Sequence, residues 1–199
     1  MRVLAFSDLH SSSRALEGIL RNSRKADALL CAGDLSMFEH GLAQILAALD
    51  RLGKPVLVVH GNHESATSMM ALCRKTAHIE FIHGRLRRLG RLAFFGWGGN
   101  GFSPIDAELE LYMRNHADRL KSASAGGNLV LLCHAPPYGT TLDLVAGEHA
   151  GSKSVRSFIE TFGPRACVCG HLHESAGMRD RIGRCVVINP GWHGMTFEL

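Results

Sequence analysis

The sequence predicts an α/β fold, a four-layered α/β/β/α sandwich in which two facing mixed sheets lie between two layers of helices. Three observations lead to it. Five short apolar runs each end in Asp, Asn or His, helical patterns separate the runs, and strand-like pieces occupy residues 79–95 and 178–199. The chain has 199 residues, of which 46% are hydrophobic, so it can build one sizeable core but hardly two. We therefore expect a single domain over residues 1–199.

The apolar runs have the length and composition of strands that are buried on both faces. They cover residues 3–6, 28–31, 56–59, 129–132 and 166–169. In open α/β sheets, ligands bind at the carboxyl ends of such strands. We therefore expect the polar residues that follow the runs to share one pocket.

Helical spacing fills the intervals between the runs. Apolar residues recur at i, i+3, i+4 and i+7 in two segments, Leu42, Ile45, Leu46 and Leu49, and Val155, Phe158, Ile159 and Phe162. Gly53 and Pro55 end the first helix, whereas Ser152 is the expected N-cap of the second and Gly163 its stop. A third helix is predicted to start at Ser103 and Pro104. Its expected core face is Leu109, Tyr112, Met113, His116 and Leu120.

The order of elements suggests how the two sheets arise. Strands and helices alternate in the first third of the chain, which predicts right-handed parallel crossovers. From Ile79 to Phe95 and from Met178 to Leu199 the pattern shortens to strand-like pieces. We expect these pieces to form hairpins that build the second sheet.

Composition limits the classes of function. The chain enters its first strand at Met1–Leu4, without room for a leader, and no apolar run has the length of a membrane span. We expect a cytoplasmic protein without a membrane partner, and hence six free cysteines rather than disulfides. The net charge of +4 gives no specific argument for nucleic acid. The dense basic stretch Arg85, Arg87, Arg88 and Arg91 is interpreted as the solvated face of a hairpin, with a phosphate-binding patch as the alternative.

The residues at the ends of the runs form a set of metal ligands. Asp8 and His10 are two residues apart, so they point to one side if strand geometry continues to His10, and His173 repeats this spacing after His171. Asp34 has two oxygens that can reach two cations. The remaining candidates are Asn62, which offers a carbonyl oxygen, and the imidazoles of His134 and His171. Mixed oxygen and nitrogen ligands suit Mn, Fe, Zn, Ni or Co better than Ca or Mg. A single such residue is usually structural, but five independent strand ends with suitable ligands favour metal.

At this point a resemblance to a known family emerges. The segments Asp8-Leu9-His10, Gly33-Asp34, Gly61-Asn62-His63-Glu64, His134 and Gly170-His171-Leu172-His173 resemble, in order and type, the motifs of the calcineurin-like metallophosphoesterase superfamily. The small size and Asn189-Pro190-Gly191 are similar to its compact prokaryotic phosphodiesterase branch. The resemblance implies a four-layered sandwich with two divalent transition-metal ions, manganese being the first candidate.

The resemblance also implies a role for each motif residue. Asp8, His10 and His173 would hold the first metal, Asn62, His134 and His171 the second, and Asp34 would bridge them. His63 would donate a proton to the leaving alcohol or hydrogen-bond the phosphate. We therefore expect a metal-dependent phosphoric ester hydrolase, a phosphodiesterase rather than a monoesterase, in which a hydroxide shared by two cations attacks phosphorus. The expected catalytic residues are His63 and Asp34.

Substrate contacts are predicted at four residues, Asn62, His63, Tyr138 and His149. Tyr138 follows a rigid Pro136-Pro137 turn beside His134, so it can stack on a leaving group or simply cover the core. His149 precedes a predicted helix N-terminus, where phosphate binding and ordinary capping are the two alternatives. The expected ligand is a small phosphoester, and the sequence predicts no oligomeric state.

Three rival functions are weighed against this hypothesis. A nuclease of the same superfamily would bind nucleic acid through a continuous basic groove, which the sequence does not indicate. A non-catalytic, protein-binding scaffold on the same fold would be expected to have lost ligands or His63. Gly96, Gly98 and Gly101 satisfy a dinucleotide-binding pattern, but no acidic strand end follows about 20 residues later.

Overall fold

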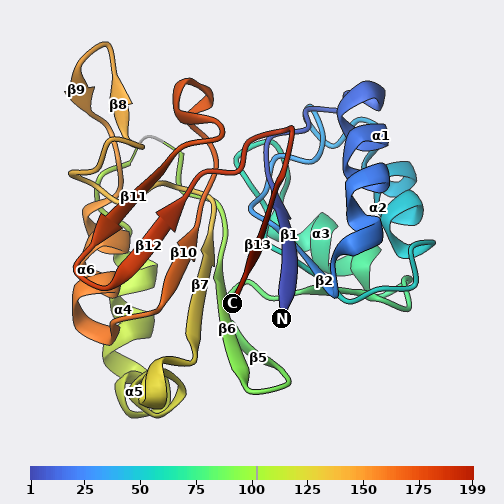
Figure 1. Cartoon of the computed structure of the whole chain (residues 1–199). Helices are drawn as coiled ribbons and strands as arrows, with labels where there is room; N and C mark the ends of the chain where they lie inside the picture. Colours follow the sequence, from blue (N-terminus) through green and yellow to red (C-terminus); the bar gives the residue numbers. More distant parts are fainter. Residues whose placement is uncertain (102) are drawn as a thin grey trace.

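The computed structural model describes residues 1–101 and 103–199 of the chain. Its first sheet has the order β13-β1-β2-β3-β4 (Figure 1). The strands are β1 (Arg2–Phe6), β2 (Ala28–Cys31), β3 (Val56–Val58), β4 (Ile79–Phe81) and β13 (Met195–Glu198). β1 to β4 are parallel, and β13 is antiparallel to β1.

The second sheet has the order β11-β12-β10-β7-β6-β5. Its strands are β5 (Arg85–Leu89), β6 (Leu92–Trp97), β7 (Leu129–Cys133), β10 (Ala166–Val168), β11 (Arg179–Ile182) and β12 (Cys185–Ile188). β6, β7, β10 and β12 are parallel, whereas β5 and β11 are antiparallel edge strands. A separate hairpin of β8 (Leu144–Val145) and β9 (Glu148–His149) projects from the top of Figure 1.

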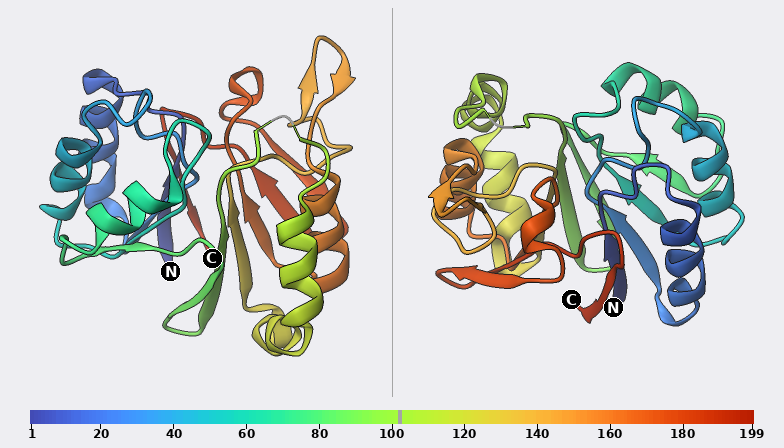
Figure 2. Two further views of the ribbon diagram at one scale, coloured as in Figure 1. Left: turned by 180° about the vertical axis from the view of Figure 1, so that it is seen from behind. Right: turned by 90° about the horizontal axis from the view of Figure 1, so that it is seen from above.

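Helices cover the outer faces of both sheets (Figure 2). The first sheet carries α1 (Ser13–Asn22), α2 (Leu42–Asp50) and α3 (Ala66–Cys73), and the second carries α4 (Ala107–Asn115), α5 (Ala117–Ser124) and α6 (Lys153–Phe162). Short 3₁₀ turns lie at Ser23–Lys25, Ala125–Gly127 and His173–Ser175. Among the residues that the structure describes, no helix is long and apolar enough to cross a membrane.

Three apolar clusters hold the layers together. Side chains alternate along each strand, so one set packs against the helices and the other against the facing sheet. The cluster between the sheets includes residues with at most 1% of their surface exposed, namely Val3, Leu30, Leu57, Phe94, Val130 and Val168. Two further clusters join each sheet to its helices. This arrangement confirms the predicted four-layered α/β/β/α sandwich with two mixed sheets.

The two periodic helices have the predicted faces and ends. All four leucine and isoleucine positions of α2 are buried, as are the four apolar positions of α6. The Ser152 hydroxyl accepts a hydrogen bond from the Val155 amide, 3.2 Å long, and Gly163 ends α6 with a φ of 56°. These caps confirm the prediction for α6.

The third predicted helix differs from the observed one. α4 begins at Ala107, not at Ser103, because the carboxylate of Asp106 caps it by accepting from the Leu109 amide at 2.9 Å. The other carboxylate oxygen of Asp106 accepts from the Trp97 indole at 2.8 Å, which fixes the start of the helix to β6. The chain also breaks at His116, where α4 ends and α5 begins. Leu109, Met113 and Leu120 are nevertheless buried as expected.

Two of the strand-like pieces belong to the first sheet, contrary to the prediction that they build the second. β4 pairs in parallel with β3 through the crossover helix α3, and β13 adds to the edge of β1. Only β5–β6 and β11–β12 are hairpins of the second sheet. Pairing partners depend on contacts far apart in the sequence, which local patterns do not encode.

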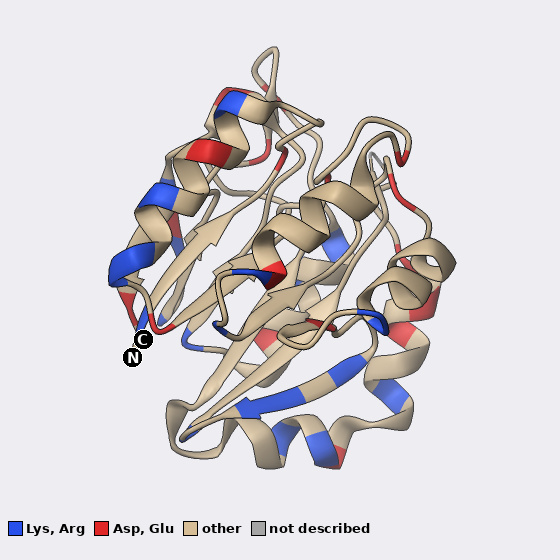
Figure 3. Ribbon diagram, turned by 90° about the vertical axis from the view of Figure 1, so that its right-hand side faces the viewer, with Lys and Arg blue, Asp and Glu red and all other residues tan. Residues whose placement is uncertain are grey.

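The cysteines and the basic stretch have the expected structural roles. All six cysteines are free and buried. Arg85, Arg87 and Arg88 lie exposed on the edge strand β5, visible as the blue segments along the lowest strand in Figure 3. Arg87 forms an ion pair with Glu80 at 2.7 Å. Charged side chains on an edge strand also discourage pairing with another sheet.

Candidate metal centre

The predicted ligands follow the carboxyl ends of strands from both sheets. Asp8, Asp34 and Asn62 come after β1, β2 and β3, whereas His134 and His171 come after β7 and β10. These loops gather at the upper edge in Figure 1. The structure brings the side chains into three overlapping groups whose ligand atoms lie within 4.8 Å of one another, Asp8–His10–His173, His10–Asp34–His63 and Asp34–His134–His171.

Asp34 lies at the centre of this constellation. Its Oδ2 is 3.5 Å from His134 Nε2, 3.9 Å from His10 Nε2 and 4.0 Å from His63 Nε2. The residue is 2% exposed, so its charge is held almost out of water. One carboxylate therefore faces the imidazoles of both expected metal sites.

The backbone at the ligands is not a continuation of the strands. Asp8, His10, Asp34 and His171 have φ values of 57°, 44°, 53° and 71°, all in the left-handed region. Strand geometry therefore does not continue to His10, so the condition for the spacing argument is not met. Asp8 and His10 still reach one group with His173, but by a tight turn that reverses the chain after β1. Such conformations cost about 1–3 kcal/mol each and are concentrated at functional sites.

Three hydrogen-bond acceptors converge between Asn62, His134 and Asp34. The Nδ1 of His134 is 2.8 Å from the carbonyl oxygen of Ala32, so Nδ1 carries the donated proton. In the neutral ring, Nε2 then presents a lone pair, which faces Asn62 Oδ1 at 3.0 Å and Asp34 Oδ2 at 3.5 Å. Acceptors that face one another are unfavourable unless a cation lies between them. The donor set therefore fits a metal ion.

The remaining histidines are also suited to hold cations. Burial lowers the pKa of His10, against the opposing effect of Asp34 and Asp8. Burial, and then the neighbouring His134, lower the pKa of His171 to about 4. Both rings are therefore neutral at neutral pH and have a nitrogen lone pair for a cation. The Nε2 atoms of His10 and His173 lie 3.0 Å apart, as two ligands of one ion can.

Glycine permits the close packing of these loops. A Cβ on Gly61 would collide with the Asp34 carboxylate, and one on Gly170 would lie 2.7 Å from the Ser7 Cβ. Across the seam between the sheets, the His171 amide donates to both carboxylate oxygens of Asp8 at 3.1 and 3.2 Å. The two halves of the site are thus linked directly.

Glu64 ties the Asp34 loop to the Asn62 loop. It is 5% exposed, and its Oε2 accepts from the amides of Asp34 and Gly61, both at 3.1 Å. Its Oε1 accepts from the Ser36 amide at 2.7 Å and the Ser36 hydroxyl at 2.8 Å. Burial raises the pKa of Glu64, although hydrogen bonds from Ser36 and Gly61 oppose the shift. The sequence showed this residue within a motif but gave no signal for its role.

His63 lies at the mouth of the site. Its amide donates to Asp34 Oδ1 at 3.0 Å, and its ring contacts the His10 ring edge-on with centroids 4.8 Å apart. Its side chain is 17% exposed. The imidazole is therefore positioned between the buried carboxylate and the solvent.

A cavity of about 300 Å³ opens above the ligands. It is lined by His10, Asp34, Asn62, His63, Val145, His171, Leu172, His173 and Glu174. Val145 belongs to the β8–β9 hairpin, which therefore forms one wall. Two of the four predicted substrate contacts, Asn62 and His63, lie in this lining.

Tyr138 and His149 are not among the described residues that line the cavity. They lie at the base of the β8–β9 hairpin, where their ring centroids are 5.3 Å apart. His149 Nδ1 is 2.8 Å from Asp143 Oδ1, and the fully buried Asp143 also accepts from the amides of Gly139, Thr140 and Gly151. Asp143 was not among the predicted site residues, although an acidic residue after the Pro136-Pro137 turn was the available signal. Through this network, Tyr138 and His149 support the hairpin.

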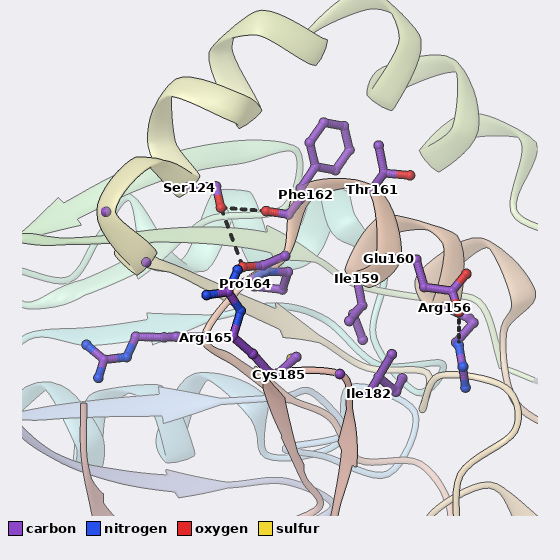
Figure 4. A pocket seen from close by; sticks show the side chains of 15 residues that line it. Ser124, Arg156, Ile159, Glu160, Thr161, Phe162, Pro164, Arg165, Ile182 and Cys185 are labelled. Atoms are coloured by element: carbon purple, nitrogen blue, oxygen red, sulfur yellow. Dashed lines mark hydrogen bonds and ion pairs between the residues drawn. The ribbon is translucent and has the colours of Figure 1, made fainter.

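A larger cavity lies at the opposite end of the second sheet, where β7 and β10 begin; Figure 4 shows its lining. It measures about 920 Å³ and is lined by the end of α6, Arg165 and the β11–β12 turn. Arg156 in its wall forms an ion pair with Glu160 at 2.6 Å. None of the three ligand groups lies there. Chemistry therefore has to be sought in the smaller cavity.

The glycine-rich loop borders the metal centre instead of forming a dinucleotide site. The Gly99 amide donates to the His60 carbonyl oxygen at 2.9 Å, and a Cβ on Gly101 would lie 3.4 Å from the His171 ring. The loop therefore packs against the segments that carry Asn62 and His171. Glycine is needed at Gly98, because a Cβ there would lie 2.5 Å from Nδ1 of the His60 ring.

Comparisons with known proteins identify the family and the fold of the chain. A model of the calcineurin-like phosphoesterase family matches residues 1–175. An uncharacterised protein of Methanocaldococcus jannaschii is 32% identical over 205 residues, covering 96% of this chain and 88% of that protein. The crystal structure of a protein of Thermus thermophilus is similar with a TM-score of 0.75 and 18% identity, covering 96% of this chain and 88% of that one.

A dimetal phosphatase from Danio rerio is similar with a TM-score of 0.66 and 12% identity, covering 94% of this chain and 86% of that one. At these identities, the structural likenesses support the fold alone. The family model, by contrast, spans every predicted ligand from Asp8 to His173. The chain belongs to the calcineurin-like phosphoesterase family.

Proposed function

We propose that this chain hydrolyses phosphodiesters with two divalent transition-metal ions. Family membership supports a metal-dependent phosphoesterase, and the dinuclear centre follows from the shared position of Asp34. That position is the observation that carries the proposal, because one carboxylate oxygen faces His10 on one side and His134 on the other at 3.9 and 3.5 Å. Manganese is the first metal to test, because the ligand set mixes oxygen and imidazole nitrogen.

The ligands divide into two groups around Asp34. Asp8, His10 and His173 would hold one ion, and Asn62, His134 and His171 the other, with Asp34 shared. Such a pair of cations supplies Lewis acidity towards the phosphoryl oxygens and lowers the pKa of a nearby water. The Ala32 carbonyl keeps the proton of His134 on Nδ1, so that Nε2 stays available as a ligand.

His63 assists the leaving group. Its ring lines the cavity, and its Nε2 is 4.0 Å from Asp34 Oδ2, so this nitrogen lies beside the proposed metal ligands. Donation of a proton from this nitrogen to the departing alkoxide contributes about 10²- to 10⁴-fold in rate. Asn62 is both a ligand and a contact for the phosphate, because it lines the cavity beside His63.

The lining of the cavity favours diesters over monoesters. Among its described residues there is no Lys or Arg, whereas Glu174 adds an acidic group. A monoester carries a second negative charge that needs a further cationic partner, but a diester carries only one charge. Val145 and Leu172 provide apolar surface for the second ester group. The six buried free cysteines support a cytoplasmic location as part of this proposal.

The test compares bis-nitrophenyl phosphate with nitrophenyl phosphate, each with Mn, Ni, Mg or a chelator. We expect metal-dependent hydrolysis that is faster for the diester and about two bound ions per chain by elemental analysis. Lys121→Ala, on the surface of α5, is the matched control and should behave as the wild type. Hydrolysis that survives chelation, or binding of a single ion at saturation, would contradict the proposal.

A further inference from the structure

Phe38 has an unusual position beside the proposed centre. Its side chain is 76% exposed, more than any other large hydrophobic residue that the structure describes. Its ring centroid lies 4.6 Å from that of His63, with the planes inclined at 58°. An exposed phenylalanine forgoes most of the stabilisation that burial of its ring would provide. The folded chain alone gives no reason for this exposure.

The backbone at Phe38 is strained as well. Phe38 and Glu39 have φ values of 50° and 65°, so two consecutive non-glycine residues adopt the left-handed conformation. For a bulky aromatic residue this is a genuine outlier, and it destabilises the folded chain. Residues in this state persist where the surrounding structure forces them and mark functional sites. Exposure and strain therefore coincide at one residue next to His63.

The loop around Phe38 is fixed from both sides. Glu39 accepts hydrogen bonds from the Ser65 amide, the Ser65 hydroxyl and the Ser68 hydroxyl at 2.9, 2.9 and 2.8 Å, which anchors it to the start of α3. On the other side, the Ser11 hydroxyl accepts from the Met37 amide and donates to the His40 carbonyl at 2.9 and 2.7 Å. The residues on both sides of Phe38 are thus anchored, which places its ring beside His63 instead of in the core.

The cavity and its lining indicate which part of a substrate the Phe38 ring would contact. At about 300 Å³ it is at the lower end of small-molecule sites, which span about 300–1,000 Å³. Phe38 is not among its described lining residues, so a substrate group that contacts the Phe38 ring lies outside the mouth. On the His63 side of that mouth stands Phe38, which offers an aromatic face to any flat group attached to the leaving alcohol.

We propose that Phe38 is a stacking platform for a nucleobase, so that the substrates of the centre are nucleoside phosphodiesters. This inference rests on the proposed function and specifies its substrate class. Stacking on an aromatic side chain is sequence-tolerant and contributes about 1–3 kcal/mol per base. Phe38 is here a residue for substrate selection, whereas His63 beside it acts on the leaving group.

The turnover experiment uses two diesters of identical reacting groups, adenosine 5′-(methyl phosphate) and 1-O-methylribose 5-(methyl phosphate), which lacks the base. With Mn-loaded protein, Phe38→Ala should lower kcat/KM for the base-bearing diester by about 5- to 140-fold and change that of the base-less diester less than about 2-fold. Phe38→Trp should keep the preference. Leu111→Ala, which removes a side chain 51% exposed on α4, is the control and should leave both values unchanged.

A binding experiment separates this inference from the proposed function. The ligands are the non-hydrolysable phosphonate analogues of the same two diesters, and their binding is measured by calorimetry. In one outcome neither diester is hydrolysed, but the wild type binds the adenosine analogue more tightly than the base-less analogue and Phe38→Ala does not. This outcome supports stacking of the base on Phe38 and refutes the proposed phosphodiesterase activity. An equal decrease of kcat/KM for both diesters in Phe38→Ala would show that Phe38 acts through His63. Unchanged kcat/KM and unchanged affinities in this variant would show that Phe38 does not contact a base. Either result overturns the inference.

Discussion

Replacement of Glu64 by glutamine tests how the two ligand loops are joined. The carboxylate accepts from two amides at Oε2 and from the Ser36 amide and hydroxyl at Oε1. In Glu64→Gln an NH₂ group takes the place of one oxygen and faces donors. The least costly orientation directs it at Ser36, whose hydroxyl can turn and accept, so that only the Ser36 amide loses its partner.

The expected size of the effect follows from this count. A hydrogen bond to a charged group contributes about 1.5–3 kcal/mol. Loss of the charge weakens the remaining bonds, but it also removes the cost of burial that raises the pKa of Glu64. We therefore expect the free energy of unfolding to fall by about 1.5–3 kcal/mol. For a chain of this length, that lowers the Tm by about 3–12 °C.

The measurement is urea unfolding of the metal-free protein, followed by circular dichroism, so that bound ions do not contribute. Glu148→Gln makes the same chemical change at an exposed position in β9 and is the control. If Glu64→Gln stays within about 0.5 kcal/mol of the wild type, as an ordinary surface substitution does, the four hydrogen bonds do not hold the loops and the reasoning is refuted.

Four further predictions follow from the site and its surroundings. Asp34→Asn should lose metal as well as activity, because one side chain faces both groups of ligands, and full metal occupancy by elemental analysis would contradict the shared role. His63→Asn should keep its metals but lose about 10²- to 10⁴-fold in turnover of alkyl diesters and much less with nitrophenyl esters, which need little protonation; equal losses would argue against proton donation. Phe38→Gly should raise the free energy of unfolding by about 0.5–1 kcal/mol, because glycine adopts a φ of 50° without strain and little buried surface is removed. Denaturant unfolding measures this change, and a decrease in the free energy of unfolding would show that the conformation of Phe38 is not strained. The Asp180 carboxylate accepts a hydrogen bond from the Thr141 amide at 2.7 Å, which lowers the pKa of Asp180 below its ordinary value of 3.8. The ionised carboxylate therefore stabilises the fold above pH 3.8, and this stabilisation is lost as the pH falls through the lower pKa of the folded state. Asp180→Asn should thus lower the free energy of unfolding by about 1 kcal/mol at pH 7 and by progressively less in acid, whereas a decrease that does not depend on pH would rule out a role of the carboxylate charge.

The sequence was sufficient for features that depend on local periodicity. Leu42 and Leu46 marked the buried face of α2, and Ser152 and Gly163 marked both ends of α6. It was also sufficient to predict that one site contains Asp8, Asp34, Asn62, His134 and His171, because parallel strands place their carboxyl ends at one edge of a sheet. In these cases the residue itself carries the physical cause.

Other features depend on contacts that a local pattern does not contain. The pairing of β13 with β1 joins residues almost 200 positions apart, and the left-handed turn at Asp8 and His10 is imposed by packing against the loop of Asp34. The role of Glu64 could not be predicted, because it depends on the amides of Asp34, Ser36 and Gly61, which only the folded chain brings to its carboxylate. Phe38 was missed because an exposed aromatic residue in a loop has no period, and its significance comes from its neighbour His63.

The seam between the two sheets has a consequence for how the protein matures. The proposed ligands on the amino-terminal side, up to Asn62, can meet their partners only after the ribosome has released His134, His171 and His173. If these residues hold the two ions as proposed, an unfinished chain carries only part of the ligand set. The ions would then join the two sheets only after His173 has been synthesised, and by mass action they would stabilise the completed fold.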